Sequence, residues 1–554
     1  CGKLDDSYVF EIGDNVYNNL LDDSIRMLYL QRCGVEVNDD TFGHKACHDT
    51  LATVYGTDQK IDVSGGWHDA GDYGRYVVPA AKAVADLLYA YGANPSLYSD
   101  NIGIPESNNG VPDILDEARF ELEWMIKMQD SNGGVHHKVS CESFPGYVMP
   151  EKETQPLIVT EISTTATADF CASMALAYEY YKDVDSDFAE KCLDCAKKAW
   201  GFLKEHPEFI FKNPEDIVTG DYGDRYDTDE RYWAATQMYR ATGDISYMDG
   251  VSAFTGLDWS TVGDYGNIAI LTMKDVDKES DIYNKAKKNI ISQADKFVNT
   301  SQNTAYGVSQ TKFNWGSNMT IANSGIVLGL AYQLTGEEKY INGANSQLDY
   351  LLGVNPIGEC FVTGYGTVSP ENPHHRPSMA QNQAMKGMLV GGVNSALEDS
   401  AAKAYCKGLP PAKCYIDNSE SYSTNEITIY WNSPLTYLIS LTEESGNTGD
   451  ILWGDANCDK EVSLADAVLI MQSLSNPDIY TLTEQGKINA DVYNNGDGIT
   501  SNDALTIQKV MIKLLNPSDL PVFDTNEPAQ TTTTTATTAK PTTTTTTNVT
   551  TAPV

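Results

Sequence analysis

The sequence contains few basic residues: 38 Lys and Arg stand against 77 Asp and Glu, which gives 554 residues a formal charge of −39. This surplus of negative charge repels polyphosphates and leaves no basic surface for nucleic acid, so nucleic-acid binding is excluded. Runs of 18 or more apolar residues are missing, and no segment is expected to span a membrane. The chain begins at Cys1 without a basic and apolar leader, so we expect a processed or trimmed form.

Cysteines are also sparse, and 11 in a chain of this size exclude a disulfide scaffold. Cys192 and Cys195 lie in a helical pattern and are expected to pack rather than to form a redox pair. Aromatic residues, by contrast, reach 10% and include 32 Tyr and 8 Trp. Aromatic rings and carboxylates together suit carbohydrate, although an acidic surface around an aromatic core is an equally open interpretation.

Amphipathic helices repeat from residue 16 to 445, as in VPDILDEARFELEWMIKMQ and NSGIVLGLAYQLTG. Long loops rich in Gly, Asp, Tyr and His lie between them, and loops of this length are usually functional. The pattern predicts an all-α fold, a helical barrel with a cleft built by loops at one end. Residues 1–15 are interpreted as a connecting segment.

The helical pattern ends near residue 445, and a short linker, 446–452, precedes two similar segments within 453–517. Residues 518–554 are dominated by Thr and Pro, bury almost no apolar area and predict a disordered, solvated linker. We expect a further module beyond Val554.

Each duplicated segment resembles a calcium-binding loop followed by a helix. Such a loop supplies oxygens at positions 1, 3, 5, 7 and 12, with a backbone carbonyl at position 7. Position 6 is Lys460 instead of Gly. The first segment places these residues in that register: Asp455, Asn457, Asp459, Glu461 and Asp466.

The second segment offers Asp491, Asn495, Asp497 and Asp503, but its span is one residue longer, which implies a bulged loop. An Asx-rich turn that merely caps each helix is the structural alternative. The duplication resembles dockerins, which bind cohesin modules of scaffoldin proteins, and the longer second loop is similar to dockerins of rumen-type bacteria. The resemblance implies calcium, a cohesin partner and a secreted protein in a cell-surface cellulosome.

Two loops carry carboxylates suited to glycosidic bond hydrolysis. GGWHDAGDYGRY places Asp69 and Asp72 three residues apart between glycines, and YIDNSESYSTNEITIYWNSPL places Asp417 and Glu426 before the last helix. Inverting hydrolysis needs a carboxylic acid and a carboxylate about 6.5–9.5 Å apart. The two loops together predict such a pair.

These motifs resemble glycoside hydrolase family 9, whose fold is an (α/α)6 barrel. The resemblance implies that Asp72 is the base, that Asp69 helps to hold the water, that Glu426 is the acid and that Asp417 supports the site. Around Glu426, Tyr415, Tyr422, Thr428, Asn432 and Ser433 match the family pattern.

A third matching segment, VTGYGTVSPENPHHRPS, places His374 and Arg376 against substrate hydroxyls in the family, with His374 beside the catalytic residues. His137, rather than His136, resembles a subsite histidine. Rings at the following positions resemble the family's stacking platforms, with core packing as the alternative for each tryptophan: Trp259, Trp315, Tyr422 and Tyr226 or Tyr222.

Two metal sites in the barrel are also predicted. Cys33, Cys47, His48 and His68 offer the ligand set of a closed zinc site. They align with the structural zinc of a family branch that often carries an immunoglobulin-like module before the barrel, and His44 is the competing ligand. Asp229 and Glu230 resemble a family calcium site, although capping of a helix explains acidic residues equally well.

Taken together, the sequence predicts an endo-β-1,4-glucanase that hydrolyses cellulose or a related β-1,4-glucan. The alternatives are xyloglucan, mixed-linkage glucan or a chitosan-like polymer as substrate, exo or processive action, and a weakly catalytic carbohydrate-binding component.

Overall fold

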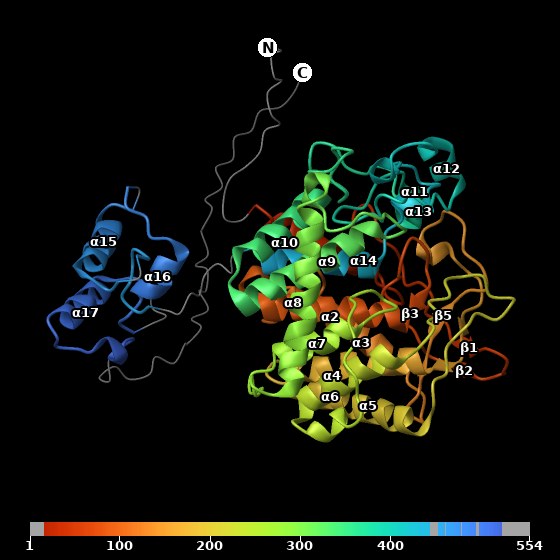
Figure 1. Cartoon of the computed structure of the whole chain (residues 1–554), viewed down its shortest axis with the longest axis horizontal. Helices are drawn as coiled ribbons and strands as arrows, with labels where there is room; N and C mark the ends of the chain where they lie inside the picture. Colours follow the sequence, from red (N-terminus) through yellow and green to blue (C-terminus); the bar gives the residue numbers. More distant parts are fainter. Residues whose placement is uncertain (1–15, 444–451, 460, 478, 495–497, 523–554) are drawn as a thin grey trace, which may run out of the picture. The chain divides into compact units, whose positions relative to one another are not determined.

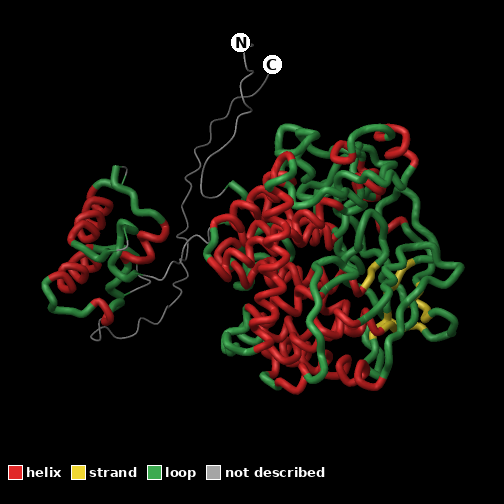
Figure 2. The backbone as a smooth tube through the Cα atoms, viewed as in Figure 1, coloured by secondary structure: helices red, strands yellow, loops and turns green. Residues whose placement is uncertain are grey.

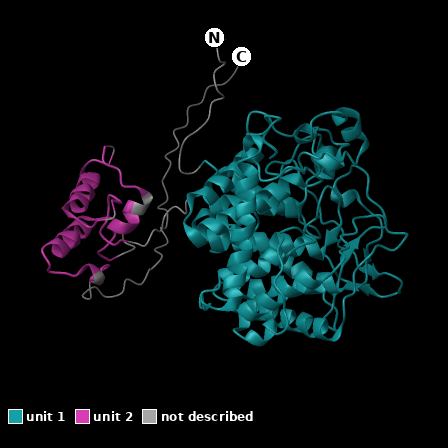
Figure 3. Ribbon diagram, viewed as in Figure 1, with its two compact units in different colours: residues 1–445 teal, residues 446–554 magenta. Residues whose placement is uncertain are grey.

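The computed structural model describes residues 16–443, 452–459, 461–477, 479–494 and 498–522. These residues form two units that divide after residue 445 (Figure 3). The predicted segment 1–15, the linker 446–452 except Leu452, and residues 523–554 lie outside the described residues, as do Asn495 and Asp497. None of the described helices is long and apolar enough to cross a membrane.

Unit 1 consists mainly of helices packed against one another (Figure 1), and their contacts arrange them in an inner and an outer set, as in an (α/α)6 barrel. In the described part of the chain, the inner ring consists of α2 (Val77–Ala93), α4 (Thr164–Tyr181), α6 (Thr228–Thr242), α7 (Gly263–Leu271), α9 (Ser317–Thr335) and α14 (Ile429–Thr442). The outer helices are α1 (Asn18–Leu30), α3 (Asp113–Lys127), α5 (Ser186–Glu205), α8 (Asp281–Ser301) and α10 (Glu338–Leu351). A 3-10 turn, Ile245–Met248, takes the remaining outer position between α6 and α7.

The distribution of apolar residues around each helix decides whether the helix lies in the inner or the outer ring. On α8 the buried residues recur every three or four positions, as at Tyr283, Ala286 and Ile290, so one stripe faces the core and the other face is solvated. On α4 nearly every residue from Thr164 to Ala177 is buried. A helix that is apolar or small around its whole circumference can only lie inside, and α4 accordingly contacts α2, α5 and α6.

A buried polar network ties the inner ring together. Lys82 of α2 forms an ion pair of 2.8 Å with Asp86, and both side chains are fully buried. Asp86 also accepts hydrogen bonds from Tyr265 of α7 and Ser433 of α14. Lys82 in turn donates to Tyr265 and to Asn323 of α9. Four inner helices therefore share one set of hydrogen bonds.

The expectation of an all-α fold misses small sheets, which Figure 2 shows as short strands gathered beside the helices of unit 1. One sheet has the order β2-β1-β6-β5-β3 and the other pairs β4 with β7. The strands are two or three residues long, too short for an alternating pattern to stand out in the sequence. Their bounds are β1 Ala52–Val54, β2 Lys60–Ile61, β3 Arg75–Tyr76, β4 Val135–His136, β5 Lys138–Ser140, β6 Ile158–Val159 and β7 Ile162–Ser163.

Three short helices lie in the late loops of unit 1: α11 (Arg376–Gln381), α12 (Ser400–Cys406) and α13 (Tyr422–Asn425). Unit 2 contains α15 (Leu464–Ser475), α16 (Glu484–Ala490) and α17 (Ser501–Met511), with α15 packed on α17. The duplication is visible in the helix starts, because Ser463 with Asp466 and Thr500 with Asp503 form the same capping box.

Candidate active site

A cleft of about 370 Å³ opens at the end of the barrel where inner helices begin. Its walls come from the loops that precede α2, α6, α7, α9 and α14 and from the first turns of α9 and α14. The lining residues include Asp69, Asp72, Tyr222, Asp258, Trp259, Trp315, Glu426 and Tyr430. The early and late carboxylates, which are more than 350 positions apart in the sequence, thus face one cavity.

The backbone joins the early and late loops directly. The amide of Ile429 donates a hydrogen bond of 2.8 Å to the carbonyl of Asp69, and Ala70 pairs with Thr428 as in an antiparallel bridge. Thr428 then caps α14 by accepting a hydrogen bond from Trp431. The start of α14 therefore holds Glu426 and Asp69 at a defined separation.

Asp72 and Asp69 have different surroundings. One oxygen of Asp72, Oδ2, accepts hydrogen bonds from the hydroxyl of Tyr76 at 3.2 Å and the amide of Gly74 at 3.3 Å. Asp69 Oδ2 accepts a hydrogen bond of 2.5 Å from Tyr222, whereas its Oδ1 has no partner within the described residues. Burial and the nearby charge of Asp72 raise the pKa of Asp69 well above its ordinary value.

Glu426 is partly exposed in the cleft wall. Its removal from water and the negative charges of Asp72 and Asp69 raise its pKa well above the ordinary value, against an opposing effect of Arg376. A carboxyl group with a raised pKa stays protonated at pH values where an ordinary glutamate has lost its proton. Glu426 could therefore donate a proton in the same cleft that Asp72 lines.

Asp417 braces the loops around Glu426. Its carboxylate accepts hydrogen bonds from the backbone amides of Glu371 and Asn372 and from the side-chain amide of Asn425, at 2.8–2.9 Å. Asn425 directly precedes Glu426 in the chain. The carboxylate thus connects the segment before His374 to the segment that carries Glu426.

The structure places His374 and Arg376 differently from each other. His374 is partly exposed, its Nδ1 is bonded to the carbonyl of Ser419, and its backbone pairs with Glu426. Arg376 is 7% exposed and donates to the carbonyls of Gly71 and Pro145, at 2.7 and 2.9 Å. Two nitrogens of the guanidinium thus hold backbone, and the bond of Arg376 to substrate stays a prediction.

His137 is fully buried, which differs from the predicted substrate contact. Its Nδ1 is 2.9 Å from the hydroxyl of Ser163, and its Nε2 is 3.1 Å from the carbonyl of Asp221. The ring stacks on Phe211 with centroids 4.1 Å apart. His137 therefore supports from behind the loop that carries Asp221 and Tyr222 into the cleft.

Of the predicted stacking rings, Trp259 and Trp315 line the cleft, and Trp315 is 43% exposed. Tyr422 lies beside Trp315 with centroids 5.2 Å apart. Tyr226 is exposed but does not line the cleft, whereas the alternative, Tyr222, does. Tyr430 also faces the cavity, and the sequence analysis did not single it out.

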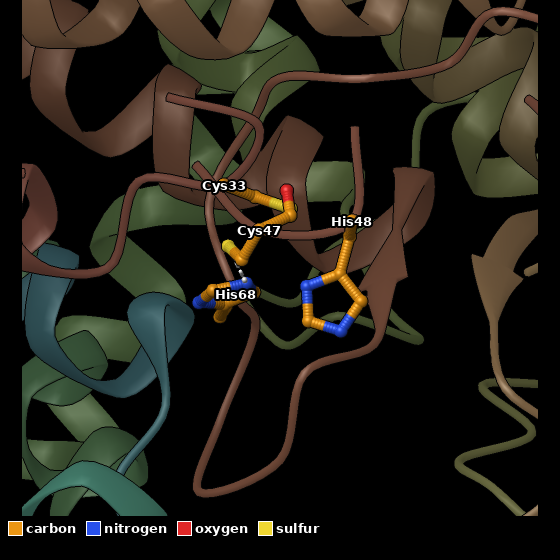
Figure 4. Close-up of side chains that lie close together, drawn as sticks. All are labelled: Cys33, Cys47, His48 and His68. Atoms are coloured by element: carbon orange, nitrogen blue, oxygen red, sulfur yellow. Dashed lines mark hydrogen bonds between the residues drawn. The ribbon is translucent and has the colours of Figure 1, made fainter. Parts of the chain in front are cut away.

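The four predicted zinc ligands come together in the fold (Figure 4). Cys33, Cys47, His48 and His68 are all buried, and one ligand atom from each lies within 4.8 Å of the others. Neither ring nitrogen of His48 has a hydrogen-bond partner among the described residues. Burial lowers the pKa of His68 to about 4, so its ring is neutral at pH 7 and can offer a lone pair. Two sulfurs and two imidazoles fit tetrahedral zinc.

The acidic residues predicted to bind calcium in unit 1 lie close to Asp169: burial and the charges of Asp169 and Asp229 raise the pKa of Glu230 well above its ordinary value. Asp229 accepts a hydrogen bond from the amide of Val262, while both oxygens of Glu230 and of Asp169 lack partners within the described residues. A separate group, which sequence reasoning missed, consists of Asp100, Asp113 and Asp116 at the start of α3.

In unit 2 the last aspartate of each predicted calcium loop acts as a cap. Asp466 accepts from the amides of Asn457 and Ser463, and Asp503 accepts from those of Val492 and Thr500. The loop residue Asp455 also accepts from the amide of Asp459. Each loop is thus folded around a carboxylate that spans it.

Comparison with known proteins gives consistent matches. Residues 17–439 match the family described as "Glycosyl hydrolase family 9". A cellodextrinase of Butyrivibrio fibrisolvens is 36% identical, over 78% of this chain and 85% of the relative. A solved single mutant of a thermostable endoglucanase from Alicyclobacillus acidocaldarius is 37% identical with a TM-score of 0.74, over 78% of this chain and 85% of its own. A structure described as a Zn-binding triple mutant of the family 9 endoglucanase J30 is 32% identical with a TM-score of 0.74, over 79% and 87%.

Proposed function

Because the chain belongs to glycosyl hydrolase family 9 and is a glycoside hydrolase of the endo-1,4-β-glucanase type, we propose that it inverts the anomeric carbon with Asp72 as base and Glu426 as acid. The observation that carries this proposal is the shared cleft, where Asp69, Asp72 and Glu426 come from opposite ends of the chain. Glucan chains are the substrates of the related enzymes, and aromatic rings in the cleft suit their apolar faces.

The proposed reaction uses Glu426 and Asp72, which line the same cleft. Glu426 donates its proton to the glycosidic oxygen as the bond to the anomeric carbon breaks. Asp72 takes a proton from a water that attacks the opposite face of the sugar, so the new hydroxyl has the inverted configuration. Asp69, held by Tyr222, is oriented to bind the same water through its unpartnered Oδ1.

The test uses Glu426→Gln and Asp72→Asn with soluble carboxymethyl cellulose, and cello-oligosaccharides for product analysis. Each variant is expected to lose turnover by at least about 100-fold while still binding oligosaccharide, since general acid–base catalysis contributes 10²–10⁴. Proton NMR of the first products should show the α-anomer. A β-anomer, or near-wild-type turnover by either variant, would reject the assignment.

The substrate is proposed to be cellulose or its soluble fragments, with xyloglucan and mixed-linkage glucan as competing outcomes. The cleft is lined by carboxylates and by Trp259 and Trp315, which suits an extended chain that stacks its rings. Reducing-sugar release from each polymer separates these substrates. A product series dominated by short oligomers from the first minutes would indicate exo or processive action in place of random internal cleavage.

Structural zinc is proposed for the group of Cys33, Cys47, His48 and His68. The donor set, the complete burial and the unpartnered nitrogens of His48 support the assignment. A bound zinc ion would cross-link the segment after α1 to the residue immediately before Asp69. The site supplies rigidity to the early catalytic loop and takes no part in the chemistry.

We further propose that unit 2 is a calcium-loaded dockerin that binds a cohesin. Asp455, Asn457, Asp459, the carbonyl of Glu461 and Asp466 would hold the first ion, and the second loop the other. Supporting this role, α15 exposes an apolar stripe of Leu464, Val468, Met471 and Leu474, which are 42–57% exposed. Such a stripe beside a pocket of about 330 Å³ suits a protein partner.

The cohesin proposal is tested with the full chain and a recombinant cohesin by calorimetry. Binding is expected with calcium and not with chelator, and Val468→Asp with Met471→Asp should abolish it. Leu514→Asp, at an equally exposed apolar position outside the stripe, is the matched control. Binding that survives in chelator would contradict the calcium requirement. Secretion, which the dockerin assignment implies, is tested by finding the enzyme in culture medium.

A further inference from the structure

A buried glutamine at the end of α1 contacts the early catalytic loop. Gln31 is 1% exposed, and its side-chain amide donates two hydrogen bonds of 3.2 Å, to the carbonyls of His68 and Ala70. These two carbonyls flank Asp69. One side chain therefore holds the peptide groups on both sides of a catalytic-loop carboxylate.

The remaining carbonyls of this loop are also held from outside. The carbonyl of Asp69 accepts from the amide of Ile429, and that of Gly71 accepts from the backbone and guanidinium of Arg376. A methyl group on Gly71 would lie 2.2 Å from the carbonyl oxygen of His374, so the two segments are in direct contact. Four consecutive carbonyls are thus fixed, and Gln31 fixes two of them.

A second buried side chain orients the glutamine. Oε1 of Gln31 lies 2.9 Å from Nε2 of His375, which is completely buried. Nδ1 of His375 lies 2.8 Å from the hydroxyl of Ser378, and that hydroxyl accepts a hydrogen bond from the amide of Met385. Because the hydroxyl oxygen already accepts, its own hydrogen is available to donate to Nδ1.

The donor and acceptor of each hydrogen bond between Ser378, His375, Gln31 and the loop carbonyls follow from the chemistry of these groups. With Nδ1 as acceptor, the neutral ring carries its hydrogen on Nε2 and donates it to Oε1 of Gln31. The oxygen of Gln31 then cannot face the two loop carbonyls, and its NH₂ group must do so. A single arrangement satisfies every group from Ser378 to Ala70.

We infer that Gln31 and His375 are positioning residues that set the orientation of Asp69 and Asp72 through the backbone of residues 68–70. Neither side chain lines the cleft, so neither touches substrate. The inference depends on the proposed roles of Asp69 and Asp72. Misplacement of a reacting group by about 1 Å can lower the rate by about 100-fold, which gives such residues a large kinetic effect.

The test compares Gln31→Leu, His375→Leu and His375→Gln in the full-length enzyme by steady-state kinetics, urea unfolding and zinc content. Gln31→Leu is expected to lower kcat about 100-fold and His375→Leu about 10-fold, with KM changed less than about 3-fold. His375→Gln keeps an N–H group that can reach Gln31 and should recover most of the lost kcat.

Gln347→Leu is the matched control. Gln347 is also fully buried, and its amide makes the same number of hydrogen bonds, to Ser309, Gly307 and Gly343, none of which lines the cleft. It should lower the urea midpoint as much as Gln31→Leu does, with kcat within about 2-fold of wild type.

The inference is overturned if Gln31→Leu retains kcat within about 2-fold of wild type, or if Gln347→Leu lowers kcat as much as Gln31→Leu does. It is also overturned if His375→Gln lowers kcat as much as His375→Leu does, or if zinc content falls in parallel with kcat. Should Gln31→Leu not fold, the two His375 variants decide the matter by themselves. Failure of the proposed catalytic roles is distinguishable, because it would appear as an active Asp72→Asn whatever the result at Gln31.

Discussion

The hydroxyl of Tyr222 donates a hydrogen bond of 2.5 Å to Oδ2 of Asp69, from a backbone position whose φ is +46°. A tyrosine rarely adopts this left-handed conformation, so the surrounding loop must stabilise it. His137 does so in part by bonding to the carbonyl of Asp221. Asp69 is therefore held from a loop more than 150 residues away.

Removal of this hydrogen bond should slow catalysis. Tyr222→Phe keeps the ring but frees Asp69 Oδ2, and we expect kcat to fall by up to about 10-fold with little change in KM, because a typical hydrogen bond contributes about 0.5–1.5 kcal/mol. Steady-state kinetics on carboxymethyl cellulose measures the effect. Tyr306→Phe, at an exposed tyrosine that also has a positive φ, should behave as wild type. Equal kcat in both variants would contradict the role of the hydroxyl.

The pH dependence of kcat/KM should report the raised pKa of Glu426. Activity requires the protonated acid, so it is lost as pH rises through this pKa, which lies well above the ordinary 4.5. Arg376 lowers the pKa of Glu426, and Arg376→Gln should move the alkaline limb to higher pH while kcat falls.

The control for this prediction is Arg119→Gln, which removes a distant charge paired with Glu123. This variant should leave the alkaline limb of the kcat/KM profile at the same pH as in the wild type. Movement of the limb to lower pH in Arg376→Gln would show that another group sets it.

Removal of the metal should destabilise the early loop. With Cys47→Ser, or after treatment with a strong zinc chelator, we expect zinc to be lost and the unfolding temperature to fall by several degrees, since metal binding contributes directly to folding. Atomic emission and calorimetry measure the two quantities. Cys195→Ser removes an equally buried thiol elsewhere and should retain the metal. A stable, active and metal-free Cys47→Ser would contradict the zinc assignment.

Removing one partner of the Lys82–Asp86 ion pair should destabilise the protein strongly, whereas replacing both partners by apolar residues should destabilise it much less. Lys82→Met leaves Asp86 buried without its cation and is expected to lower the free energy of unfolding by about 3–5 kcal/mol. The double variant Lys82→Met with Asp86→Leu should recover a large part of this loss. Urea unfolding of the three proteins provides the comparison, and equal losses in the single and double variants would argue against an electrostatic cause.

Much of the site could be predicted because its chemistry is carried by compact motifs. Asp69 and Asp72 stand in one loop, Glu426 and Asp417 in another, and the zinc group needs only Cys and His at separations that a fold can bridge. The helical class followed from the apolar period, and the (α/α)6 barrel followed from the resemblance to the family. The short strands were missed because two or three residues leave no alternating pattern.

Other assignments depended on contacts that local sequence does not encode. Arg376 was expected only to bind substrate, and the sequence did not predict that its guanidinium also holds the carbonyls of Gly71 and Pro145. His137 was expected in the cleft and lies behind it. The same type of residue can bind substrate or support a loop, and only the direction of its side chain in the fold shows which of the two it does.

The sequence by itself determined which groups are present: two loops with carboxylates, two thiols with two imidazoles, and enough amphipathic helices to form a barrel. Tertiary structure alone decided their relationships, since α14 brings Glu426 to Asp69 and Gln31 meets His375 across 344 positions. The physical reason is that side-chain chemistry is local, whereas orientation and pKa depend on which distant groups the fold packs against it.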